Sequence, residues 1–135
     1  MDARNDTKDD LLLRIREHAG NMLEHAAALH FDVHGLDQVS TLPQLVRQNI
    51  YLVFKEAINN IARHNASPEV WITLDNQPGG MFVTIKNTID AGKPKSAYTG
   101  QGLRNMQMRA KRLKAMIDIN NDGKLFAVMI KMRRW

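Results

Sequence analysis

The sequence predicts a two-layer α/β (α+β) sandwich, in which three helices pack on one face of a mixed, mostly antiparallel sheet of about five strands. Three observations favour this class. Three long segments repeat their apolar residues with the period of a helix, and five shorter segments read as strands. Two pairs of these strands are joined by turn sequences rich in glycine, asparagine and aspartate. Neither an internal repeat nor a low-complexity tract in the sequence indicates another architecture.

The first helix is expected from Leu11 to about Leu29, after a cap at Asp9 or Asp10. His18 lies away from the apolar face of this helix, so we expect it to face solvent. The apolar face itself must pack on another element, and its members recur at helical spacing: Leu12, Ile15, Ala19, Met22, Leu23 and Ala26.

A short strand at about 30–33 precedes a second, longer helix. Thr41 and Gln44 form a plausible capping box at the start of this helix, with Pro43 in the first turn. The helix is expected to continue to about His64.

Two hairpins supply the other strands. The first joins Glu69–Leu74 to Met81–Lys86 through residues 75–80, which include Pro-Gly-Gly. The second joins Met116–Asn120 to Lys124–Met132 around an Asn-Asp-Gly turn.

A long loop, about 88–101, and the third helix, Leu103 to about Lys114, separate the two hairpins. Most connections in compact domains have about 4 to 6 residues, and this loop is roughly three times as long. Its length without periodicity suggests a lid.

Composition favours a single compact domain at residues 10–135, after a disordered lead-in at 1–9. With 135 residues, 44% of them hydrophobic, the chain is long enough for one core. The sequence has no cysteine, which excludes a disulfide framework and a thiolate metal site. No apolar run approaches the roughly 20 residues of a membrane span, and the N-terminus lacks the order of a signal peptide. We therefore expect a cytosolic domain without membrane contact.

The net charge of +5 is concentrated around the lid. Residues 86–114 contain eight Lys or Arg residues and a single acid, Asp90. Such a field attracts a polyanionic ligand, although Lys111, Arg112 and Lys114 are explained as well by a solvated helix face. This basic stretch lacks the interleaved aromatic rings of a single-strand site, since Tyr98 is the one ring in the loop, so we expect no nucleic-acid partner.

The second helix carries a polar stripe within the otherwise apolar segment 54–64. Glu56, Asn60 and either Arg63 or His64 are about one turn apart and share one face. A carboxylate there can activate a nucleophile beside Mg²⁺, which favours few protein oxygens plus substrate phosphates. The stripe therefore suits phosphoryl transfer. The alternative is a half-buried helix whose Glu and Asn cap a neighbouring loop.

Two glycines, Gly100 and Gly102, precede the strongly helical run of the third helix. Glycine lets the backbone approach a phosphate closely, and the free N–H groups of a helix's first turn then face the anion. A flexible loop before an uncapped helix would give the same pair of glycines.

The order of these motifs resembles a known family. An E-x-x-x-N helix, two strands, a long loop and G-x-G-L-x-N-M-x-x-R-A are similar to the Bergerat-fold ATP-binding domain that gyrase, heat-shock chaperones, histidine kinases and mismatch-repair proteins share. Within that superfamily the sequence is most similar to sensor histidine kinases of the class that pairs with helix-turn-helix response regulators. The resemblance covers about residues 10–133.

The resemblance implies a role for each matching position. Glu56 corresponds to the general base or water-positioning residue, and Asn60 corresponds to the Mg²⁺ ligand. His64 would support the site rather than accept the phosphoryl group. The positions implied to contact or flank the nucleotide come from both motifs: Asn59, Asn60, Arg63, His64, Gly100, Gln101, Gly102, Leu103 and Arg104.

One motif departs from the family pattern, which places D-x-G-x-G after the second hairpin strand, with its Asp bound to the adenine amino group. Asn87 stands where that Asp is expected. Its carbonyl still accepts a hydrogen bond, but a neutral acceptor forms a bond roughly half as strong as a charged one. Asp90 and Gly92 could substitute after a register shift, and we favour Asn87.

The resemblance implies an ATP-binding catalytic domain that uses ATP and Mg²⁺ and donates the γ-phosphoryl group to a histidine on a separate dimerisation domain, serving a response regulator indirectly. We expect it to be the cytosolic part of a membrane-anchored kinase, and we expect no autophosphorylation by this chain alone. Two alternatives remain open: a degenerate interaction module that no longer binds ATP, and a Ser/Thr kinase like the small anti-sigma-factor kinases.

Overall fold

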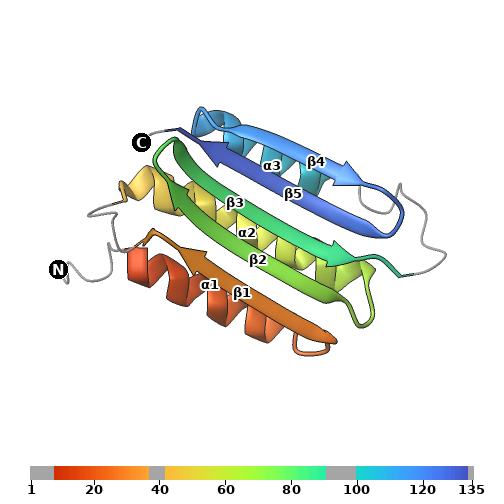
Figure 1. Ribbon diagram of the computed structural model, residues 1–135. Helices are drawn as coiled ribbons and strands as arrows, with labels where there is room; N and C mark the ends of the chain where they lie inside the picture. Colours follow the sequence, from red (N-terminus) through yellow and green to blue (C-terminus); the bar gives the residue numbers. More distant parts are fainter. Residues whose placement is uncertain (1–7, 37–41, 91–99, 134–135) are drawn as a thin grey trace.

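The computed structural model describes residues 8–36, 42–90 and 100–133. These residues form one five-stranded sheet of order β1-β2-β3-β5-β4 with three helices behind it in Figure 1. The elements along the chain are α1 Lys8–Met22, β1 Ala28–His34, α2 Gln44–His64, β2 Glu69–Gln77, β3 Gly80–Thr88, α3 Gln101–Arg112, β4 Met116–Asn121 and β5 Leu125–Met132.

The sheet is mixed and mostly antiparallel, as the sequence predicts. β1 pairs with β2 in parallel, whereas the β2–β3, β3–β5 and β4–β5 pairs are antiparallel. Helix α2 lies between α1 and α3 and packs against both (Figure 1). The predicted fold class, three helices on one face of a five-stranded sheet, is confirmed.

The core fills the space between the helices and one face of the sheet. Every second residue of the central strands is buried, as expected when one sheet face is covered and the other meets solvent. Large side chains of α2 fill the space opposite, with Phe54, Ile58 and Ile61 at most 2% exposed. Burying such a side chain stabilises a fold by roughly 1.5–3 kcal/mol.

The first helix ends earlier than its periodicity predicts. The predicted end is about Leu29, but α1 ends at Met22, and Ala28 and Leu29 belong to β1. The backbone N–H of Ala27 donates to the carbonyl of Pro68 at 2.8 Å, and Ala28 then pairs with Glu69. A strand pairing with a residue some forty positions away therefore overrides the local helical pattern.

The start of α2 matches the prediction in part. The helix begins at Gln44, and Pro43 occupies the N-cap position without a side-chain cap. Thr41, the other member of the expected capping box, lies outside the described residues.

The first hairpin is tighter than predicted because its strands extend to Gln77 and Gly80, leaving Pro78 and Gly79 as the turn. Gly80 has φ +145°, and a Cβ there would lie 2.3 Å from the carbonyl oxygen of Met132. Only glycine therefore fits this corner of the sheet.

The second hairpin turns close to the predicted Asn-Asp-Gly sequence, since β4 ends at Asn121 and β5 begins at Leu125. The Asp122 carboxylate accepts hydrogen bonds from the backbone N–H groups of Leu125 and Lys124, each at 2.8 Å. These two bonds hold the pKa of Asp122 below its usual value, and the bond from Leu125 has the larger effect. In the ranges 8–36, 42–90 and 100–133, no helix is long and apolar enough to cross a membrane.

Candidate functional site

The two sequence motifs meet where α2 packs against α3. Glu56 lies half-buried on α2, and Asn105 of α3 donates through Nδ2 to its Oε1 at 3.4 Å. A Cβ built on Gly102 would lie 3.1 Å from Glu56 Oε2. The carboxylate of the first motif therefore sits directly against the first turn of the helix that carries the second.

The N-terminus of α3 has the features of an anion-binding helix start. Its N-cap is Gly100, with φ +118° and ψ −151°, and glycine offers no capping side chain. The first turn contains no acidic residue. The N–H groups of a first turn have no partner within the helix, and together with the helix dipole they favour a negative charge.

A chain of hydrogen bonds connects the surface of α3 to Glu56. Arg104 donates from its guanidinium to Gln101 Oε1 at 3.2 Å, and Gln101 Nε2 donates to Asn105 Oδ1 at 3.0 Å. Asn105 then donates to Glu56. Leu103, on the same turn, packs its half-buried side chain against the hydrophobic core.

Among the described residues, three buried carboxamides each leave one polar atom without a hydrogen bond, and two of these atoms belong to predicted site residues. These two atoms are Nδ2 of Asn60, which is 8% exposed, and Oδ1 of Asn87, which is 1% exposed. Asn87 uses its Nδ2 to donate to the carbonyl of Thr88 at 2.8 Å. A buried polar atom without a partner costs about 1–3 kcal/mol, so each is a place where a ligand gains by supplying the missing partner.

Asp90 is engaged in the structure itself. Its Oδ2 accepts from the backbone N–H of Ala66 at 2.9 Å, and its backbone N–H donates to Asn65 Oδ1 at 3.2 Å. Asn65 donates in turn to the carbonyl of Ile61 near the end of α2. Asp90 therefore ties the end of β3 to the end of α2, and Gly92 lies outside the described residues.

The remaining predicted positions of α2 have different surroundings. Asn59 faces α1, where its Oδ1 lies 2.9 Å from His18 Nε2. His18 is consequently half-buried, and the expectation that it faces solvent is wrong. Arg63 is exposed, and His64 is half-buried and interacts with other residues of the chain.

Sequence reasoning missed two residues of the site. Asn105 stands within the glycine motif, four residues after Gln101, and that spacing allows the Gln101–Asn105 bond. Asn65 follows His64 directly and is 7% exposed, with both ends of its amide hydrogen-bonded. Its position after a helix end was the available signal.

Curated relatives are sensor histidine kinases. Sensor histidine kinase YvfT of Bacillus subtilis (strain 168) is 24% identical over 108 residues, which cover 79% of this chain and 29% of the relative. Sensor histidine kinase YxjM of the same organism is 32% identical over 94 residues, covering 68% of this chain and 22% of the relative. The chain thus spans less than a third of either relative, and no family model matches it.

Solved structures show the same fold. The histidine kinase domain of a blue-light activated histidine kinase from Erythrobacter litoralis superposes with a TM-score of 0.71 at 18% identity, over 91% of this chain and 60% of that one. The histidine kinase AdeS of Acinetobacter baumannii gives a TM-score of 0.70 at 18% identity, over 93% and 64% of the respective chains. This chain is accordingly a homologue of sensor histidine kinases and has the fold of the histidine kinase catalytic domain.

Proposed function

We propose that the chain binds Mg²⁺-ATP and donates the γ-phosphoryl group to a histidine on a separate dimerisation domain, as the catalytic domain of a cytosolic kinase module. The observation that carries this proposal is the contact between the Glu56 carboxylate and the uncapped, acid-free start of α3 at Gly102. This contact would bring a general base, Glu56, next to the backbone N–H groups that would bind the phosphates. A response regulator would receive the phosphoryl group from that histidine.

The adenine and metal roles fit the unpaired atoms. Asn87 Oδ1 is a buried acceptor, which complements the amino group of adenine. Asn60 carries a carboxamide oxygen, a ligand type that Mg²⁺ accepts, and its unpaired Nδ2 would donate to a phosphate oxygen. Mg²⁺, when bound, neutralises charge on the phosphates.

The phosphate groups would be held chiefly by α3. The backbone N–H groups that follow Gly100 supply donors, and Arg104 on the exposed face supplies a guanidinium. Leu103 anchors this turn in the core. Two further assigned residues, Arg63 and His64, would contact or flank the nucleotide from the end of α2. Gln101 would orient Arg104 through its hydrogen bond.

Glu56 would either accept the proton of the attacking nucleophile or hold that nucleophile in position. Asn105 fixes one carboxylate oxygen by its hydrogen bond, and Gly102 leaves the other room. A base that is oriented before the nucleotide arrives loses less conformational entropy in the transition state.

Calorimetric titration with ADP and with a non-hydrolysable ATP analogue, each with and without Mg²⁺, tests the proposal. We expect binding that Mg²⁺ strengthens. No detectable heat at about 1 mM nucleotide, equivalent to less than roughly 4 kcal/mol of binding free energy, would overturn it.

The neutral Asn87 favours a second candidate, a degenerate module that binds a protein partner rather than ATP. An amide in place of a carboxylate removes the charge-assisted bond to adenine. Under this candidate neither nucleotide binds, with or without Mg²⁺, and the same titration therefore separates the two functions.

A further inference from the structure

A cavity lies outside the candidate site, between the N-terminal halves of α1 and α2. These helices run side by side in the same direction (Figure 1). The cavity has a volume of about 470 Å³, and cationic side chains from both helices line it: Arg14 from α1, and Arg47 and Lys55 from α2. We call it the α1–α2 groove. It contains none of the residues to which the proposed phosphoryl transfer assigns a role.

Two of the three cations of the groove have a defined contact. The Arg14 guanidinium lies over the Tyr51 ring, with its carbon 4.3 Å from the ring centroid. Arg47 donates through Nε to the carbonyl of Leu42 at 2.9 Å. Among the described residues, Asp10 is the single acid that lines the groove, against three cations, so this part of its wall carries a positive excess. A stacked guanidinium keeps its edge available for an anion.

The spacing of these groups fits an elongated ligand. Arg47, Tyr51 and Lys55 follow one another at intervals of four residues on α2, and so extend over about 12 Å of the helix axis. A phosphate-sized anion can contact only one end of such a row. The half-buried Leu52 side chain adds apolar surface to the same groove. A ligand with repeated acids beside apolar side chains matches both features.

We infer that the α1–α2 groove binds an acidic amphipathic helix of a partner protein. On a helix, carboxylates eight residues apart are about 12 Å apart, which matches the separation of Arg47 and Lys55 along α2, with Tyr51 under the Arg14 guanidinium standing between them. Helix-in-groove recognition of this kind uses apolar anchors for affinity and surrounding charges for specificity. One turn beyond Arg14 on α1, His18 is bonded to Asn59 and lies edge-on to Tyr51, with the two ring centroids 6.4 Å apart.

Fluorescence anisotropy with a designed probe tests this inference. The probe is a labelled Ala/Leu peptide of about 18 residues with Glu at every fourth position, long enough to form a helix. A peptide with Gln in place of each Glu is the control ligand. We expect the Glu peptide to bind and the Gln peptide to bind much more weakly. Equal binding of the two, or no binding of the Glu peptide, would contradict the inference.

Paired protein variants locate the binding. The double variant Arg14→Gln/Lys55→Gln should weaken binding of the Glu peptide by about fivefold or more, since two charges that face the peptide are removed. The matched variant Lys111→Gln/Arg112→Gln removes the same charge from the exposed face of α3 and should change the affinity less than about twofold. Equal losses in both would show non-specific attraction and reject the groove.

A charge reversal gives an independent check. Lys55→Glu should weaken the Glu peptide further, and a peptide in which one Glu is replaced by Lys should recover part of the affinity. Full displacement of the Glu peptide by inorganic phosphate would indicate a compact anion site instead. If the protein binds anionic lipid vesicles, and both double variants lose this binding equally, a helical partner is likewise rejected. None of these measurements uses nucleotide, so the result is independent of the proposed function.

Discussion

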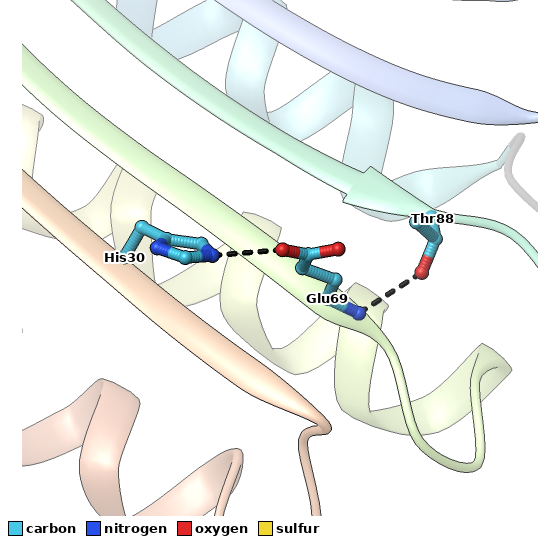
Figure 2. Close-up of polar contacts among 3 residues, drawn as sticks. All are labelled: His30, Glu69 and Thr88. Carbon is cyan, nitrogen blue, oxygen red and sulfur yellow. Dashed lines mark hydrogen bonds and ion pairs between the residues drawn. The ribbon is translucent and has the colours of Figure 1, made fainter.

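Neighbouring residues at the end of β3 show how differently the two faces of the sheet treat polar groups. Thr88 faces the open side, where its hydroxyl accepts from the backbone N–H of Glu69 at 2.9 Å, and Glu69 bonds His30 at 2.8 Å (Figure 2). Asn87 faces the helices and keeps a buried oxygen without a partner among the described residues. On the open face water can replace any lost partner, whereas on the buried face only a ligand can. Unpaired polarity therefore indicates a binding site only on the covered face.

Asn49 limits this rule. It lies on α2, 2% exposed, and its Oδ1 has no partner in the described part of the chain, while its Nδ2 donates to the carbonyl of Leu45. Asn60 differs in its position, one turn after Glu56 on the same helix. An unpaired atom thus identifies a site only beside other groups of suitable chemistry, and Asn49 is the natural control.

The largest expected effect comes from Asn60→Ala. Loss of a metal ligand should reduce Mg²⁺-dependent ADP affinity by roughly 10- to 100-fold, since even outer-shell partners of a metal contribute that much. The free energy of unfolding should change by less than about 1 kcal/mol, because the lost packing is offset by removal of an unpaired donor. Calorimetry and urea denaturation measure the two quantities.

The control for this variant is Asn49→Ala, which removes the same side chain from the same helix. We expect ADP affinity to stay within about twofold of the parent, because Asn49 has no role in the proposed site. If both variants lost affinity equally, the metal-ligand assignment of Asn60 would be wrong.

A second test of the buried face is Asn87→Asp. A carboxylate forms a charge-assisted bond to the adenine amino group, so we expect adenine nucleotides to bind roughly three- to tenfold more tightly. The reference variant, Asp90→Asn, disturbs the bond to the Ala66 N–H and should lower stability with little effect on affinity. A loss of affinity in both variants would instead make Asp90 the adenine residue.

The arrangement of the fold was predictable because it depends on repeated local signals. The apolar periodicity of α2 and α3 and the glycine-containing turns at Gly79 and Gly123 specify helices and hairpins within a few residues. The early end of α1 was not predictable, because it follows from the parallel pairing of Ala28 with Glu69. That pairing joins segments on either side of α2.

The candidate site was predictable in its motifs but not in its contacts. Spacing alone placed Glu56 and Asn60 on one helix face. It gave no sign that Asn59, the next residue to Asn60, would bond His18, or that Asp90 would cap Ala66. Both contacts depend on which neighbouring element packs beside the residue, and only the tertiary structure determines this.

Gly102→Ala should have a smaller effect on binding. The added Cβ would lie 3.1 Å from Glu56 Oε2, so the carboxylate must move by a few tenths of an ångström. We expect nucleotide affinity to fall about two- to fivefold, a cost below about 1 kcal/mol. Stability should change little, because alanine's better helix propensity, worth about 0.8–1 kcal/mol, offsets the crowding.

Gly20→Ala supplies the comparison for that variant. Gly20 lies in α1, and a Cβ there meets nothing within 4 Å in the described residues. We expect a gain of about 0.5–1 kcal/mol in unfolding free energy and unchanged nucleotide affinity. An equal gain from Gly102→Ala, with no loss of affinity, would mean that Glu56 is not confined by α3.

The smallest effect is expected on the open face, at His30 and Glu69. Their side chains are 45% and 41% exposed, and such exposed side-chain pairs contribute little, about 0.2–1 kcal/mol. His30 also stacks on Trp71, with ring centroids 5.6 Å apart. His30→Ala therefore removes this stacking as well as the bond to Glu69, and its effect on stability exceeds that of losing the bond alone. A double-mutant cycle of His30→Ala and Glu69→Ala isolates the coupling, which should stay below about 1 kcal/mol in urea denaturation. Nucleotide affinity should be the same in all four proteins, because water replaces every partner removed there. A coupling above about 2 kcal/mol, or a change in ADP binding, would remove the distinction between the two faces on which the site assignment rests.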